Sequence, residues 1–136
     1  MMSGTNDGRY RRDMNFRIMA MVTALAGTVL GARFIFSGAS ILKDWGLAAE
    51  AGSLVIARRL GALYLGLALM FFLGRDAGPS DLRSGLSLGV GVASALLAGL
   101  GLFELSAGRV TTGIIVPSVA ELVLAAGFGW AWWAGR

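Results

Sequence analysis

The sequence contains no cysteine and no histidine, and its one lysine is Lys43. Most sites for haem iron, iron–sulfur clusters and structural zinc use thiolate or imidazole ligands, so none of these groups is expected here. A buried lysine that would hold retinal as a Schiff base is not expected either, because Lys43 lies in a predicted loop. We therefore predict neither a cofactor nor a bound metal ion.

Charge is also scarce: 15% of the 136 residues are charged, whereas 56% are hydrophobic. This composition is too apolar for a soluble domain of this size. Glycine is abundant, with 21 residues, and it lies among Leu, Ala and Val as it does in membrane helices that approach closely. The net charge of +4 comes from arginines at the ends of apolar runs, which indicates orientation in a membrane and no nucleic-acid partner.

Four apolar runs are long enough to cross a bilayer as helices, over residues 18–42, 54–73, 85–105 and 110–133. The sequence predicts an all-α membrane protein, a four-transmembrane-helix bundle formed by residues 16–136. Residues 1–15 are polar and are predicted to be an exposed, loosely ordered tail. Arg11 and Arg12 also fit an export signal, but the first run is longer than a signal core and three more spans follow it.

Four spans place both termini on one side of the membrane. Seven basic residues would share that side, against four on the other. The first group is Arg9, Arg11, Arg12, Arg17, Arg75, Arg83 and Arg136, and the second is Lys43, Arg58, Arg59 and Arg109. The positive-inside rule then predicts cytoplasmic termini.

Several local signals predict how the spans pack and end. Ala24, Gly27, Gly31 and Gly38 share one stripe of the first span, which favours packing inside the bundle over dimerisation. Residues 43–53 are predicted to form a loop with a short interfacial helix anchored by Trp45. Ser80 or Asp81 is predicted to cap the third span, and Trp130, Trp132 and Trp133 are predicted to lie at headgroup level.

Four charged residues interrupt or end the apolar runs. Glu121 lies near the middle of the last run, Arg33 interrupts the first, Arg59 opens the second and Glu104 ends the third. At a rise of about 1.5 Å per residue, all four fall in the half of the bundle away from the termini. Pro117, one turn before Glu121, predicts a bend and a spare carbonyl acceptor at that point.

Two interpretations of these charges remain open. In the first, Glu121 pairs with Arg33 or Arg59 and fixes the register of the helices. In the second, the same groups line a cavity in which arginine binds an anionic headgroup or substrate and a carboxyl group exchanges protons. Tyr64 and Ser118 would add hydrogen bonds to such a cavity. No motif spacing supports a glycosidase-type acid pair or a carboxylate metal site.

Residues 59–66, with the sequence Arg-Leu-Gly-Ala-Leu-Tyr-Leu-Gly, and residues 118–124, with the sequence Ser-Val-Ala-Glu-Leu-Val-Leu, carry a resemblance to a known family. The layout over residues 18–133 resembles the DoxX-like group of small four-helix bacterial membrane proteins. The resemblance implies a four-helix bundle in a bacterial inner membrane, in a group sometimes associated with quinone-linked redox systems. It transfers no catalytic residue, and the cysteines that a redox role would use are missing here.

Three hypotheses for function follow. The first is a non-catalytic accessory or scaffold subunit of a membrane assembly, in contact with lipids and with a larger complex or further copies of itself. The second is a binder or transporter of lipids or small molecules that uses Arg33, Arg59 and Glu121. The third, which is less favoured, is a membrane enzyme in which Glu121 and Glu104 act as acid and base. A small multidrug-type transporter is disfavoured because its membrane glutamate lies in the first span, where this chain has Arg33.

Overall fold

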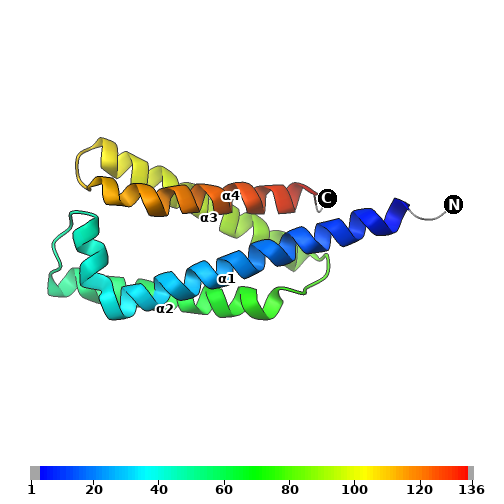
Figure 1. Cartoon of the computed structure of the whole chain (residues 1–136), viewed down its shortest axis with the longest axis horizontal. Coiled ribbons are helices and arrows are strands. Elements are labelled where there is room, and N and C mark those ends of the chain that lie inside the picture. The colour runs from blue at the N-terminus through cyan, green and yellow to red at the C-terminus, as the bar shows by residue number, and fades with distance from the viewer. Residues whose placement is uncertain (1–3, 135–136) are drawn as a thin grey trace.

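The computed structural model describes residues 4–134, and the side chains of residues 13–134 (Figure 1). Its elements are α1 (Gly4–Asp44), α2 (Ala51–Gly74), α3 (Asp81–Ser106), a 3-10 turn η1 (Thr112–Ile114) and α4 (Ile115–Ala134). All four α-helices contain stretches long and apolar enough to cross a membrane. The predicted all-α, four-span fold is confirmed. Residues 1–3 and 135–136, which belong to the predicted tail and to the end of the predicted membrane domain, lie outside the described residues.

The helices run alternately in opposite directions and form two hairpins, α1 with α2 and α3 with α4 (Figure 1). Packing between the hairpins is mainly between α1 and α4. The start of α1 and the end of α4 lie at the same end of the bundle, together with the α2–α3 loop; we call this the termini end. The other end, which holds the α1–α2 and α3–α4 connections, is the distal end.

The first helix begins earlier than the sequence suggested. Residues 4–15 continue α1 as helix, in the segment for which the sequence predicts an exposed tail. Once the long apolar helix is nucleated, adding polar residues to its end costs little, because each adds one backbone hydrogen bond. The part of α1 that is long and apolar enough to cross a membrane lies within Asp13–Asp44 and includes the predicted first span.

Near its other end α1 is kinked at Ser37, whose φ of −133° and ψ of 28° lie outside the helical range. Figure 1 shows the last turns leaving the axis of the rest of the helix. Ser37 is followed by Gly38, and such Ser/Gly pairs are a recognised cause of helix kinks. The connection from Trp45 to Glu50 is not helical, so the predicted interfacial helix in residues 43–53 was wrong. Trp45 instead packs its ring edge against Phe34, at a centroid distance of 5.8 Å.

Small residues bring the backbones of α1 and α2 together. Gly27, Gly31 and Gly38 all face α2, which confirms that the predicted stripe packs inside the bundle. The closest approach joins Gly31 and Gly61, each of which lies against the carbonyl oxygen of the other. Lipid tails are as apolar as leucine, so helices in a bilayer associate through this kind of close van der Waals packing.

The α3–α4 hairpin uses a different stripe from the one that glycine positions alone would indicate. The buried residues of α3 follow heptad spacing from Ser87 through Gly91 and Ser94 to Ala98, whereas Gly89 faces open space. Gly91 lies against Phe128 of α4. The start of α3 follows the prediction, because the Ser80 side chain accepts a hydrogen bond from the backbone N–H of Arg83.

Contacts near each end of the bundle join the two hairpins. At the termini end Phe16, Phe71 and Phe128 form one buried cluster from α1, α2 and α4. At the distal end Thr111 donates two hydrogen bonds, from its N–H to the Trp45 carbonyl (2.9 Å) and from its hydroxyl to the Asp44 carbonyl (2.6 Å). The outward faces of all four spans expose large apolar side chains, as a lipid-facing surface does.

Candidate functional site

The charge that interrupts the first span has a partner on its own helix. Nη2 of Arg33 lies 3.7 Å from Oδ2 of Asp44. In an unbroken helix these residues would be separated by about 16 Å along the axis. The kink at Ser37 shortens that path and lets the end of α1 neutralise Arg33. Both side chains are about half exposed, so the pair belongs to the distal surface.

Glu104 also has a local partner. Its carboxylate accepts a hydrogen bond from Nε of Arg109, which lies in the loop that follows α3. This bond raises the pKa of the Arg109 guanidinium above its ordinary value. The guanidinium also lies over the Phe103 ring, 5.2 Å from its centroid. Glu104 is therefore tied to the distal connection of its own hairpin.

Arg59 points away from the bundle. The inward face of α2 is marked by its buried residues Ala57, Gly61, Ala68 and Phe71, and at about 100° per residue Arg59 lies about 160° from Gly61. Val55 and Leu63, one turn to either side, are exposed apolar residues. None of the ion pairs among the described residues includes Arg59.

Glu121, in contrast to the outward-facing Arg59, lies on the inward face of α4. It is about 20° around the helix from the fully buried Phe128, and it is partly buried. It lies within electrostatic reach of Tyr64 on α2, whose ring stacks on Phe34 at a centroid distance of 5.9 Å. The described ion pairs leave Glu121 without a basic partner. The predicted pairing with Arg33 or Arg59 is not found, because Arg33 is held by Asp44 and Arg59 faces outward.

Pro117 and Ser118 shape the start of α4. Pro117 lies in the first turn of α4, where the N–H that it lacks would have no helical partner. The predicted bend within a continuous span was wrong: the irregularity precedes the proline, as η1. Ser118 is 1% exposed and faces α3, with a hydroxyl that has no hydrogen-bond partner among the described residues. A Cβ atom on Gly101 would lie 2.5 Å from that hydroxyl, so Ser118 fills the space that this glycine leaves.

Sequence reasoning missed a polar network at the termini end. Arg83, 8% exposed, donates hydrogen bonds to Oδ1 of Asp13 (2.8 Å) and to the carbonyl of Ala77 (2.9 Å). Its guanidinium also lies over the Phe16 ring, 4.3 Å from the centroid. These contacts tie the start of α3 to α1 across 70 residues of sequence. The sequence contains both Arg83 and Asp13, but it places Asp13 in a segment predicted to be an exposed tail. Their pairing was therefore not predicted.

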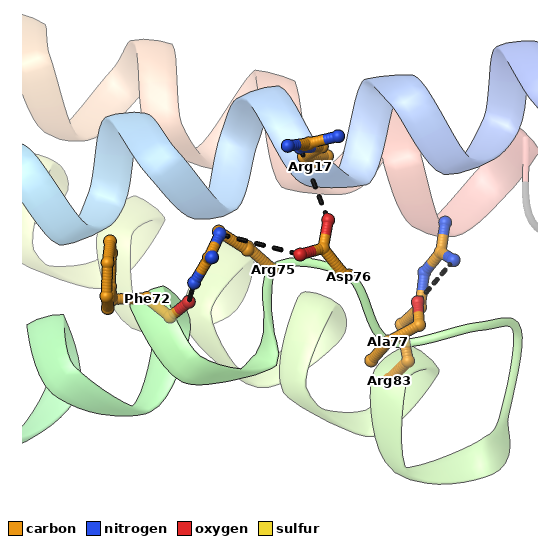
Figure 2. Close-up of polar contacts among 6 residues, drawn as sticks. All are labelled: Arg17, Phe72, Arg75, Asp76, Ala77 and Arg83. Atoms are coloured by element: carbon orange, nitrogen blue, oxygen red, sulfur yellow. Dashed lines mark hydrogen bonds and ion pairs between the residues drawn. The ribbon is translucent and has the colours of Figure 1, made fainter.

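A second part of this network centres on Asp76 (Figure 2). Nε of Arg17 lies 3.3 Å from one carboxylate oxygen of Asp76, and Nε of Arg75 lies 3.5 Å from the other. Arg75 also donates through Nη1 to the Phe72 carbonyl at 2.5 Å. A pocket of about 240 Å³ opens beside these residues and Asp13.

The polar groups thus lie in three places: the distal surface, the bundle interior at Glu121, and the termini end. No protein-family model matches the chain, and no curated protein or solved structure is significantly similar to it. The DoxX-like resemblance of residues 59–66 and 118–124 therefore remains a prediction.

Proposed function

We propose that the protein is a non-catalytic subunit of a membrane assembly and that the outward face of α2 contacts another membrane polypeptide. Arg59 is the observation that supports this proposal. It lies about 12 Å along α2 from Ala51, on a face where its neighbours are apolar, and none of the ion pairs between side chains of residues 13–134 neutralises it. Lipid tails cannot satisfy a guanidinium, whereas a carboxylate on a neighbouring helix can.

A comparison of two adjacent arginines tests the proposal. Arg58 and Arg59 carry the same charge and are both exposed, but they point about 100° apart around α2. The full chain is extracted in mild detergent from the membranes of its own organism, and the mass and composition of the complex are measured by native mass spectrometry. We expect the wild type and Arg58→Gln to retain a second polypeptide in fixed stoichiometry, and Arg59→Gln to lose it.

The outcomes separate this proposal from a lipid interaction. If Arg59 reaches the headgroups along its own side chain, as arginines near helix ends do, the wild type is recovered with lipid alone and the proposal fails. It also fails if the only protein recovered is further copies of this chain, or if both variants keep the second polypeptide equally well.

Glu121 supports a second function, the binding of a membrane-soluble cation inside the bundle. A carboxylate that faces the bundle interior without a basic partner is costly unless a ligand or a proton neutralises it. The Tyr64 ring, which lies within electrostatic reach of Glu121 and stacks on the buried Phe34, would supply one aromatic neighbour for such a cation. An acid–base pair with Glu104 has less support: Gly101 lies against Ser118, so the level of Glu121 on α3 is about 9 Å from Glu104.

The lipophilic cation tetraphenylphosphonium tests the second function. We expect it to bind the purified wild type and Glu104→Gln with the same affinity, and to bind Glu121→Gln at least tenfold more weakly. Equal binding to all three proteins would remove the support for a cation site. The result is independent of the subunit proposal, because Arg59 and Glu121 lie on different helices and face different surroundings.

We also propose that the membrane is a bacterial inner membrane and that the termini end faces the cytoplasm. The distribution of arginines between the two ends supports this orientation.

A further inference from the structure

The pocket beside Asp76 is lined by two arginines and two aspartates, and the aspartate at position 13 is also bound by the buried Arg83 outside the lining. Three arginines meet two aspartates in this network: Arg17 and Arg75 share Asp76, and Arg83 is bound to Asp13. Asp76 therefore neutralises only one of its two arginines. The pocket lies against the end of α2 and the loop that follows it.

Arg17 and Arg75 are held in position by Asp76 and still have N–H groups that could donate to a ligand. Asp76 contacts only the Nε atom of each guanidinium, and Nη1 of Arg75 is taken by a carbonyl. No hydrogen bond or ion pair is described for the two Nη groups of Arg17 or for Nη2 of Arg75, whose guanidinium lies over the Phe72 ring, 4.4 Å from the centroid. The Arg17 side chain is 62% exposed. Figure 2 shows Arg17 and Arg75 on either side of the Asp76 carboxylate. A guanidinium group is planar and presents several N–H donors on one side, and here Asp76 fixes its Nε edge. This geometry suits an oxyanion with several acceptor oxygens.

The position of the pocket in the bundle limits the classes of ligand that can reach it. It lies at the level where apolar α2 ends at Gly74 and where α3 has not yet begun. In a bundle that crosses a bilayer, this level meets the lipid phosphates. We propose that this pocket binds a phosphate group through Arg17 and Arg75, and that an anionic phospholipid headgroup is its source.

Native mass spectrometry of the purified full chain measures this binding. The protein is incubated with phosphatidylglycerol, with phosphatidylcholine, or with inorganic phosphate as the soluble source. We expect one phosphatidylglycerol molecule to remain bound to each chain, phosphatidylcholine to be retained at least tenfold less, and millimolar inorganic phosphate to leave the bound lipid in place. Equal retention of the two lipids would overturn the proposal. Displacement by inorganic phosphate would overturn the lipid as the source and assign a soluble phosphate.

Variants with opposite expected effects separate a binding site from a structural contact. Arg17→Gln removes two free donors and a charge, and we expect it to lower phosphatidylglycerol retention at least tenfold. Asp76→Asn breaks the same ion pair but raises the local positive charge, so retention should stay equal or increase. Arg58→Gln, at the distal end of α2, is the charge-matched control and should have no effect. Loss of retention in both Arg17→Gln and Asp76→Asn would mean that the ion pair only holds the loop, and the proposal would fail.

Discussion

Gly31 and Gly61 lie back to back where α1 crosses α2. A Cβ atom on Gly61 would lie 2.7 Å from the carbonyl oxygen of Gly31, and one on Gly31 would lie 2.8 Å from the carbonyl oxygen of Gly61. A backbone oxygen cannot rotate aside as a side chain can, so a methyl group at either position must push the helices apart. The closest contact of the first hairpin therefore depends on the absence of two side chains.

The first prediction is that Gly61→Ala destabilises the protein by about 1–3 kcal/mol, the usual cost of overpacking. Gly66 lies on the same helix but has nothing within 4 Å of the position of a Cβ atom. Gly66→Ala should therefore be neutral or slightly stabilising, because alanine has the higher helix propensity. Reversible unfolding in mixed micelles with increasing SDS measures both. Equal stability of the two variants would contradict the close crossing.

The second prediction concerns Ser118 and Gly101, the corresponding contact of the other hairpin. Ser118→Ala should be neutral or stabilising, because it removes a buried hydroxyl that has no partner. Gly101→Ala alone should be destabilising, since its methyl group would meet that hydroxyl. In the double variant the clash is relieved, so the double-mutant cycle should give a clear coupling energy. Additive effects in the same unfolding assay would show that the two residues do not touch.

The third prediction concerns the buried arginine of the termini end. Arg83→Met keeps an apolar side chain beside Phe16 but removes the guanidinium that lies over its ring, which leaves Asp13 and the Ala77 carbonyl without this donor. Asp13 is 45% exposed, so water recovers part of the loss, and we expect a cost of about 1–3 kcal/mol. Arg109→Met removes the exposed partner of Glu104 and should change the thermal midpoint little. The reverse order of the two variants would contradict the assigned burial.

The fourth prediction concerns the orientation of the protein in the membrane. The sequence contains no cysteine, so a thiol reagent labels only a cysteine that is introduced. Single cysteines replace Pro79 in the α2–α3 loop and Ala107 in the distal connection, both exposed. With termini in the cytoplasm, a membrane-impermeant maleimide added to intact spheroplasts should label Ala107→Cys and spare Pro79→Cys until the membrane is opened. The opposite pattern would place the termini outside.

Hydropathy was sufficient to locate the spans, because a bilayer imposes one length on every crossing and because each run ends at charged or turn residues. The Ser80 cap and the stripe of Gly27, Gly31 and Gly38 were also predictable, since both depend on spacing within a single helix. The packing stripe of α3 was harder to predict, because its glycines lie on more than one face: Gly91 faces α4, whereas Gly89 faces open space.

The partners of the charges could not be predicted in the same way. Arg33 reaches Asp44 only because α1 is kinked at Ser37. The neighbouring Gly38 fits the packing stripe equally well, so it gave no separate signal of a kink. Arg83 and Asp13 are brought together by two helices that are far apart in the sequence, and the polarity of residues 1–15 indicated a tail. Hydropathy measures transfer from water to lipid and carries no information about which charges meet.

The two hydrogen bonds of Thr111, the phenylalanine cluster and the Arg83–Asp13 pair join one hairpin to the other near the two ends of the bundle. During synthesis the first hairpin can therefore enter the membrane and complete its close crossing before the second has left the ribosome. If the chain is cut between residues 77 and 79 and expressed as two fragments, each half should insert by itself and the halves should reassociate. The protein would then behave as two insertion units joined by a tether, in which the order of assembly is set by translation.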